Sequence, residues 1–248
     1  MKWRLIELEE NNAFVNMATD EAVSEALARG VAKPTIRFYV WKPSAVSVGY
    51  FQSLTREVNL EKCRELGVDF VRRRTGGGAV YHDHDGEITY SVIAPASLLP
   101  SDIIESYKVV CGWIVKGLNR LGISAEFKAI NDIVVGGRKI SGNAQTRRGG
   151  ILVQHGTVLY DVDLRKMFSL LKVSDEKISD KLIKSAEERV TRILDHVQVS
   201  TQEAYDALVA GFTEGKEYQV GRLSVEEDAR AHELATGKYM TVGWNYRR

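Results

Sequence analysis

The chain has 248 residues, of which 44% are apolar and 27% charged, and its 34 Lys and Arg against 33 Asp and Glu give a formal net charge of +1. This composition is typical of a globular domain and excludes a disordered chain. A charge so close to zero excludes a general attraction to nucleic acid or to anionic membranes, so any anion site must be local.

Two cysteines, Cys63 and Cys111, are too few for a disulfide framework, and the five histidines show no metal-binding spacing. The N-terminus is charged where a signal peptide needs an apolar run, and no apolar stretch is long enough to span a bilayer. The sequence therefore predicts a cytoplasmic protein that forms one domain over residues 1–248.

Short β-branched and aromatic runs alternate with amphipathic segments along the chain. Strands are expected at residues 3–8, 35–40, 45–48, 68–72, 79–82, 87–93, 130–135, 138–144 and 151–160. Helices are expected at 16–28, 59–66 and 102–121, and the remainder after residue 160 is expected to be helical and charge-rich. Because strands cluster centrally and helices flank them, we expect an α+β fold with a mixed or antiparallel central sheet.

The most unusual segment is an arginine triplet, Arg72 to Arg74, that runs through Thr75 into the glycine triplet Gly76 to Gly78. Glycines let backbone N–H groups approach a ligand closely, and guanidinium groups offer forked donors to carboxylates or phosphates. The segment has neither the Walker A pattern nor the spacing of a dinucleotide-binding fold. It indicates an anion site, the alternative being a tight turn beside solvated arginines.

A second cluster reads as two strands joined by a Gly-Gly hairpin turn and runs from Asn131 to Gln145. Lys139 begins the second strand, where it is either an exposed cation or a donor to an acyl or phosphoryl oxygen. Asp132 is either a turn residue or a carboxylate that orients Mg²⁺ or a nucleotide. The spacing alone leaves both alternatives open.

Together, RRRTGGGAVYHD and NDIVVGGRKISGNAQ resemble the catalytic domain of the lipoate-protein ligase A family, in the biotin/lipoate ligase superfamily. The resemblance extends to ILVQHGTVL at 151–159, to KSAEERV at 184–190 and to Trp244-Asn245-Tyr246. It implies that ATP, with its Mg²⁺, activates lipoate as lipoyl-AMP, and that no redox cofactor is bound. The acyl group then passes to a lysine of a lipoyl-acceptor domain, either a 2-oxoacid dehydrogenase E2 subunit or the glycine cleavage carrier protein.

The resemblance also assigns roles to residues. Lys139 matches the lysine that contacts the lipoate carboxylate and the α-phosphate, and is expected to be catalytic. The residues expected to bind ATP or lipoyl-adenylate are Arg73, Gly76, Gly77, Gly78, Ala79, Val80, Tyr81, His82, Asn131, Asp132, Lys139 and His155. Mg²⁺ is expected near Asp132 without a dedicated protein site. His82 and His155 could equally be structural side chains.

The principal alternative is an octanoyltransferase, a relative that takes an acyl chain from acyl carrier protein through a cysteine thioester and needs no ATP. The stretch from Glu126 to Asp132 contains no cysteine, Cys111 falls on the apolar face of a long helix and Cys63 on a short amphipathic one, so the ligase is the preferred interpretation. The additional C-terminal domain of many bacterial ligases is not found before Arg248, which predicts a separate accessory subunit. A biotin ligase is disfavoured because its Gly-Arg-Gly-Arg loop is absent.

Overall fold

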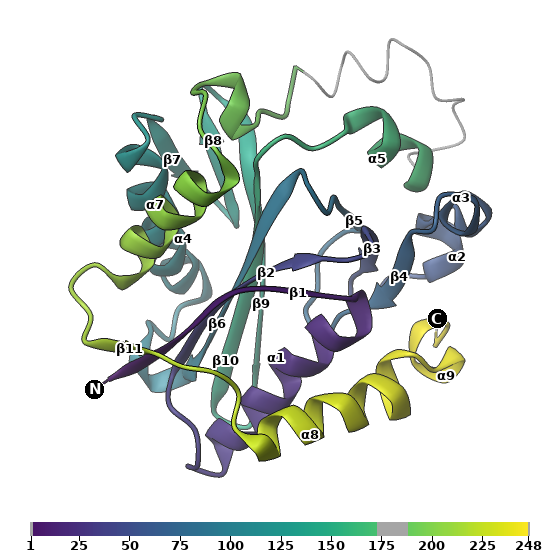
Figure 1. The fold of residues 1–248 in the computed structure, drawn as a ribbon, viewed down its shortest axis with the longest axis horizontal. Helices are drawn as coiled ribbons and strands as arrows, with labels where there is room; N and C mark the ends of the chain where they lie inside the picture. The colour runs from purple at the N-terminus through teal and green to yellow at the C-terminus, as the bar shows by residue number, and fades with distance from the viewer. Residues whose placement is uncertain (1, 173–187, 248) are drawn as a thin grey trace.

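The computed structural model describes residues 2–172 and 188–247, and its core is one large mixed sheet with helices on both faces (Figure 1). The sheet has eight strands in the order β11-β1-β2-β6-β10-β9-β8-β7. Their bounds are β1 Trp3–Asn11, β2 Thr35–Trp41, β6 Glu87–Pro95, β7 Ala125–Lys128, β8 Asp132–Val135, β9 Arg138–Arg148, β10 Ile151–Leu159 and β11 Tyr218–Val220. Strand β1 is parallel to both of its neighbours, whereas every pairing from β2 to β7 is antiparallel.

A second, three-stranded sheet has the order β4-β3-β5. It consists of β3 (Ala45–Val48), β4 (Asp69–Arg72) and β5 (Val80–His82), with β3 parallel to β4 and antiparallel to β5. The glycine triplet therefore belongs to the connection from β4 to β5. In Figure 1 this sheet lies on the same side of the large sheet as the C-terminus.

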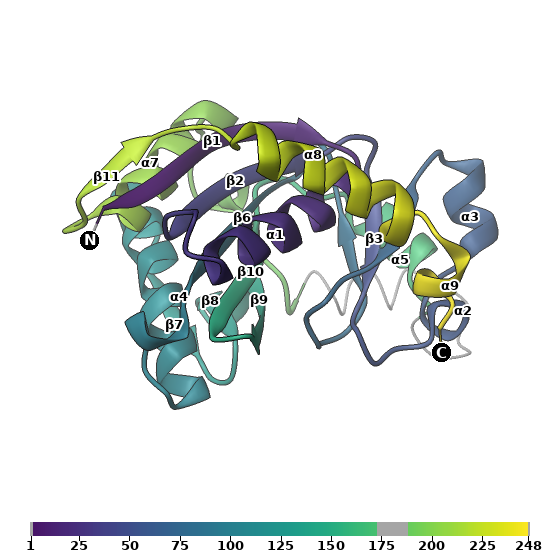
Figure 2. The same ribbon diagram turned by 90° about the horizontal axis from the view of Figure 1, so that it is seen from below.

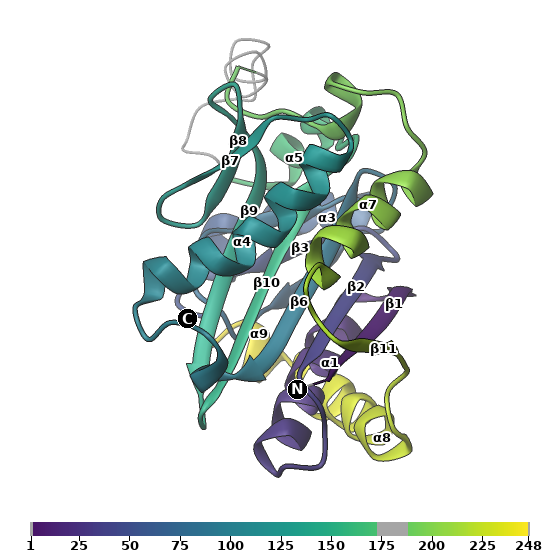
Figure 3. The same cartoon turned by 90° about the vertical axis from the view of Figure 1, so that its left-hand side faces the viewer.

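The helices lie on opposite faces of the large sheet, α4 and α7 on one and α1 and α8 on the other (Figures 2 and 3). Their bounds are α1 Ala13–Ala28, α2 Leu54–Glu57, α3 Leu60–Glu65, α4 Ile103–Arg120, α5 Leu164–Leu170, α7 Thr201–Thr213, α8 Val225–Leu234 and α9 Val242–Asn245. Helix α1 begins where the Asn12 side chain accepts the backbone N–H groups of Phe14 and Val15. It ends before Gly30, whose positive φ of 75° is the expected glycine conformation there.

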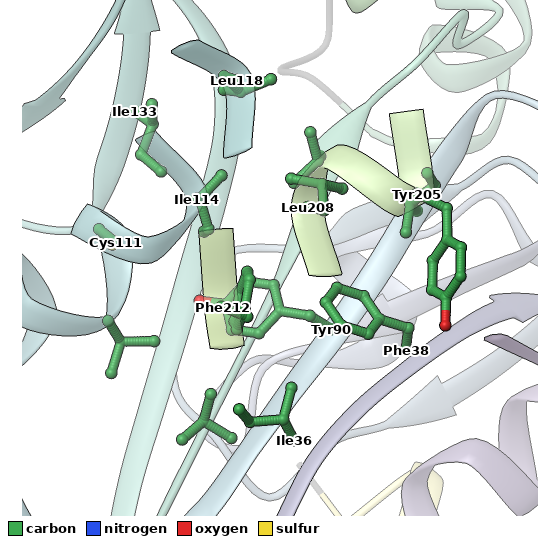
Figure 4. Packing of buried hydrophobic residues seen from close by; sticks show 14 of the residues in the cluster. Ile36, Phe38, Tyr90, Cys111, Ile114, Leu118, Ile133, Tyr205, Leu208 and Phe212 are labelled. Atoms are coloured by element: carbon green, nitrogen blue, oxygen red, sulfur yellow. The ribbon is translucent and has the colours of Figure 1, made fainter. Parts of the chain in front are cut away.

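The main core lies between the sheet and helices α4 and α7 (Figure 4). The Phe212 ring of α7 meets the rings of Phe38 and Tyr90, with centroids 5.1 and 4.8 Å apart. The two helices approach closely because Gly117 and Gly211 face each other, and a Cβ on Gly211 would come within 2.5 Å of the Gly117 nitrogen. This packing makes β6, β9 and β10 a rigid support for whatever their opposite face carries.

The predicted fold class is confirmed, as are the predicted strands and the three predicted helices, with bounds shifted by a few residues. Among the described residues, α2, β7 and the 3-10 helix at Ala96–Leu98 were not predicted, and β11 lies in the part after residue 160 that was expected to be helical. Residues 184–187 of the segment that carried part of the family resemblance lie outside the described residues. Among the described helices, none is both long and apolar enough to cross a bilayer.

Candidate active site

A cavity of about 180 Å³ opens where the two sheets meet. The large sheet contributes residues of β2, β6, β9 and β10, and the small sheet contributes β3, β5 and the glycine connection. Most residues expected to bind the substrate line it, namely Arg73, Gly77, Gly78, Ala79, Val80, His82, Asn131, Lys139 and His155. The structure thus brings together two motifs that are about fifty residues apart in the sequence.

Three predicted residues are not part of the cavity lining, namely Gly76, Tyr81 and Asp132. Tyr81 points to the other side of β5, where its ring is 2% exposed within an apolar cluster. Gly76 contributes through its carbonyl, and Asp132 contributes through Lys139, as described below.

Lys139 begins β9, and its Nζ lies 2.7 Å from Oδ1 of Asp132 at the start of β8. The hairpin between the strands turns at Gly136 and Gly137, both with positive φ, as the sequence predicted. The backbone N–H of Lys139 donates to the Arg189 carbonyl, and its carbonyl accepts from the Thr191 N–H. Lys139 is therefore held on both sides while its ammonium stays at the cavity wall.

Two asparagines join the β8 and β9 ends of the cavity. The Asn131 side chain donates to the Asn143 carbonyl at 2.5 Å, and the Asn143 side chain donates to the Asn131 carbonyl at 2.8 Å. Asn143 also accepts the hydroxyl hydrogen of Tyr90 at 2.6 Å. Asn131, predicted as a nucleotide contact, is thus held in the cavity lining by two reciprocal hydrogen bonds with Asn143 of the neighbouring strand.

Arg73 is the only one of the three arginines that lines the cavity. It is 4% exposed, and its guanidinium makes five hydrogen bonds: to the carbonyl and hydroxyl of Ser47, to the Thr75 hydroxyl, and to the carbonyls of Gly76 and Gly78. No carboxylate among the described residues forms an ion pair with it. Burial lowers the pKa of Arg73 to about 10, which is still high enough to keep it charged at neutral pH.

Arg72 and Arg74 have other roles than the anion contact predicted for the triplet. Arg72 is buried and donates to the carbonyls of Gly49, Gln52, Trp244 and Asn245, so it ties β4 to the C-terminal helix α9. Arg74 lies 3.6 Å from the Glu21 carboxylate. Of the glycine triplet, Gly77 alone has a positive φ, 92°.

Both predicted histidines are buried at the cavity wall. The ring of His82 stacks on Trp41 at 3.9 Å and bonds Ser47 and Glu87. His155 bonds Thr75 at 2.7 Å and faces Asp20 at 3.4 Å. The sequence analysis missed four residues of this site: Asp20, Ser47, Thr75 and Glu87. Asp20 and Glu87 could have been found, because each is a charged residue inside an apolar segment that is expected to be buried.

The chain that forms this cavity is similar in sequence to known proteins. Residues 12–213 match the family described as "Lipoyl protein ligase A/B catalytic domain". The chain belongs to this family. Its curated relatives include the octanoyltransferases LipM of Brevibacillus brevis, 37% identical over 100% of this chain and 99% of the relative, and of Kyrpidia tusciae, 37% identical over 99% of both.

Solved structures of the family have the same fold. One, from Thermoplasma acidophilum, is described as a bi-partite lipoate protein ligase and its E2 lipoyl domain, with a TM-score of 0.88 and 34% identity over 99% of this chain and 96% of that one. Another is described as lipoate-protein ligase A bound with ATP, with a TM-score of 0.86 and 32% identity over 99% of both chains.

The comparison corrects the preferred interpretation of the sequence. An ATP-dependent, adenylate-forming lipoate-protein ligase was expected, but the curated relatives that match the whole chain at 32–37% identity are named octanoyltransferases. The expectation rested on the absence of a cysteine near Lys139. That absence removes one nucleophile from the cavity but supplies no argument for ATP, because an acceptor amine can also attack a thioester directly.

The cysteines lie where the sequence placed them, inside the protein. Cys111 of α4 and Cys63 of α3 are both 0% exposed, and neither lines the cavity. Burial raises the pKa of Cys111 to about 12 and that of Cys63 to about 11, so neither forms a thiolate near neutral pH. In the described parts of the chain, no three His, Cys, Asp or Glu side chains are grouped to hold a metal ion.

Proposed function

We propose that this chain is a protein octanoyltransferase that moves an octanoyl group from the thioester of an acyl carrier protein to a lysine of a lipoyl domain. The observation that carries the proposal is the match to octanoyltransferases along the full length of both chains. The acceptor follows from the E2 lipoyl domain named with the Thermoplasma acidophilum structure. A glycine cleavage carrier protein would offer the same lysine chemistry.

The cavity suits an acyl thioester in its distribution of apolar and polar groups. Met17, Trp41 and Val80 offer apolar surface for a medium-length acyl chain. The Lys139 ammonium stands at the wall, where a thioester carbonyl oxygen would gain negative charge as the amine attacks. We assign Lys139 the stabilisation of that charge.

The transfer needs no acyl-enzyme on this chain. The acceptor amine forms the amide C–N bond by attacking the thioester carbonyl, and the C–S bond then breaks. The proton that the amine loses passes to the departing thiolate, and Asp132, 2.7 Å from Lys139, holds the ammonium at the cavity wall during the transfer. Because neither cysteine lines the cavity, we propose direct transfer with donor and acceptor bound together.

The test is a transfer assay with the purified chain, octanoyl acyl carrier protein and an unmodified lipoyl domain, read by intact mass. We expect one octanoyl group on the lipoyl domain without ATP, and formation of this product slowed by about 100-fold or more with Lys139→Ala. A parallel reaction receives free lipoate or octanoate with ATP and Mg²⁺. Modification in that reaction alone would overturn the proposal. Adding a candidate accessory subunit tests whether a second polypeptide is needed, which remains a prediction.

A further inference from the structure

Two chains of hydrogen bonds, each beginning at a buried carboxylate, end on the same guanidinium. In the first, His82 Nδ1 lies 2.7 Å from Glu87 Oε1, and His82 Nε2 lies 2.8 Å from the Ser47 hydroxyl. The Ser47 hydroxyl in turn accepts from Arg73 Nη1 at 3.1 Å. All four residues are at most 5% exposed.

The second chain repeats the first with different residues. His155 Nδ1 faces Asp20 Oδ2 at 3.4 Å, and His155 Nε2 lies 2.7 Å from the Thr75 hydroxyl. The Thr75 hydroxyl accepts from Arg73 Nε at 3.1 Å. These residues come from α1, β10 and the glycine connection, so the two chains reach Arg73 from different parts of the fold.

The chemistry of the groups determines which atom donates in each hydrogen bond of the two hydrogen-bond chains. A carboxylate only accepts, so Nδ1 of each histidine carries the hydrogen that faces Glu87 or Asp20. In the neutral ring Nε2 then accepts, and the Ser47 and Thr75 hydroxyls must donate to it. Each hydroxyl oxygen is thereby left to accept from Arg73. Burial outweighs the attraction of Asp20 and lowers the pKa of His155, which favours the neutral ring.

Arg73 uses its remaining donors on the glycine loop. Its Nη2 donates to the carbonyls of Gly76 and Gly78, both at 2.7 Å, and so bridges the two ends of that loop. Gly49 lies behind the loop so closely that a Cβ there would collide with the Gly77 carbonyl. The loop is thus held between the Gly49 backbone and the Arg73 guanidinium. The two histidines position that guanidinium through the Ser47 and Thr75 hydroxyls.

We propose that His82 and His155 are positioning residues that act through Ser47, Thr75 and Arg73 to fix the Gly76–Gly78 loop at the cavity. The duplication is the reason to prefer this role over a nucleophilic Ser47, although Ser47, His82 and Glu87 have the connectivity of a catalytic triad. Thr75 has the same connectivity, and both hydroxyls serve one arginine. The claim that the loop matters for turnover rests on the proposed function. The claim that these hydrogen bonds fix the position of the loop does not.

The first test measures the loop without any substrate, by hydrogen–deuterium exchange of the peptide that covers residues 73–81. Ser47→Ala and Thr75→Val remove one hydroxyl each with little change of volume. We expect the Gly76 to Val80 amides to exchange at least several-fold faster in both variants, with thermal unfolding close to that of the wild type. His84→Asn is the control, because His84 pairs with Glu10 and Asp85 and has no link to Arg73.

The second test separates the functions of the two ring nitrogens of His82 with two substitutions, each of which keeps only one of them. His82→Gln can keep an acceptor toward Ser47, whereas His82→Asn can keep the donor toward Glu87 and loses Ser47. We expect Gln to retain slow loop exchange and Asn to lose it, and in the transfer assay we expect Asn to lower kcat more than it raises KM. Unchanged loop exchange in Ser47→Ala and Thr75→Val would overturn the inference. Recovery of an octanoyl ester on Ser47 would overturn it in favour of a nucleophilic serine.

If octanoyl transfer is not the activity, the exchange results still decide the positioning role, since no substrate is present in that measurement.

Discussion

Gly142 lies directly beneath the side chain of Lys139, where a Cβ would come within 2.9 Å of both Cε and Nζ. The residue three positions after the lysine must therefore be small for the ammonium to lie against β9. The contact is with the end of a flexible side chain, so a methyl group at this position would displace the lysine and leave the strand in place.

Gly142→Ala is thus expected to lower acyl transfer by roughly 10- to 100-fold, because the ammonium no longer meets the reacting carbonyl. The free energy of unfolding should change by less than about 1 kcal/mol. Steady-state transfer assays and urea unfolding measure the two effects. Gly112→Ala on helix α4 is the matched control, since a Cβ there meets nothing within 4 Å. Equal activity of the two variants would contradict the placement of Lys139.

Removal of the Lys139 side chain tests its role directly. We expect Lys139→Ala to lower kcat by about 100- to 1000-fold, the effect typical of losing one group that stabilises an oxyanion. Because its side chain is 42% exposed, thermal unfolding should be nearly unchanged. Lys108→Ala, at an exposed position of α4, controls for loss of a surface charge. A fully active Lys139→Ala enzyme would remove this lysine from the mechanism.

The cysteines provide a separate test of direct transfer. Iodoacetamide at pH 8 should leave Cys63 and Cys111 unmodified in the native protein and label both in urea, because both thiols are buried and their pKa values are raised to about 11 and 12. Replacing each by alanine should cost roughly 1 kcal/mol of stability and leave the transfer rate unchanged. A folded Cys111→Ala variant without activity would instead identify that thiol as the acyl carrier.

A buried ion pair joins β1 to α8, near the two ends of the chain, and is expected to make the stability depend on pH. Arg4 on β1 grips Glu227 on α8 with two contacts of 2.6 Å. Burial raises the pKa of Glu227, but hydrogen bonds from Arg4 and Ser224 outweigh it and the pKa lies below its ordinary value of 4.5. The unfolded chain therefore binds this proton more tightly, so the stabilisation is complete above pH 4.5 and is lost as pH falls through the folded-state pKa.

Glu227→Gln should lower the unfolding free energy at pH 7 by about 3–5 kcal/mol, because Arg4 is left buried without its partner. The variant should also lose less stability than the wild type between about pH 5 and pH 3. Urea titrations at several pH values measure both effects, with Glu226→Gln at the exposed neighbouring position as the control. Parallel acid profiles for wild type and Glu227→Gln would refute the assignment.

Sequence patterns predicted most of the fold because, in most elements, the local turn and capping residues and the pattern of buried side chains indicate the same secondary structure. The Gly136-Gly137 hairpin and helix α4, with its apolar face, are examples. Strand β11 was missed because all its residues are exposed and its partner β1 lies more than 200 residues away. Strand β7 was missed because it is short and only half-buried, so neither its burial nor its length produces a distinct pattern.

The candidate site was predictable only where a motif marks it. Arg73 and Lys139 stand in unusual local sequences, and both reach the cavity. Ser47 and Thr75 are ordinary residues in their segments, and their relation to Arg73 exists only in three dimensions. The wrong choice between ligase and octanoyltransferase has a similar cause, because both activities need the same fixed cation and the sequence does not show which leaving group departs.

The stacking of Trp41 on His82 has a practical consequence. This indole lines the cavity and lies 3.9 Å from a ring at the base of one of the Arg73 hydrogen-bond chains. The emission of an indole responds to the groups packed against it, so the protein carries its own optical reporter at the place where an acyl chain would enter. With Trp3, Trp113 and Trp244 replaced by phenylalanine, ligand occupancy could be followed by intrinsic fluorescence on the timescale of a single turnover.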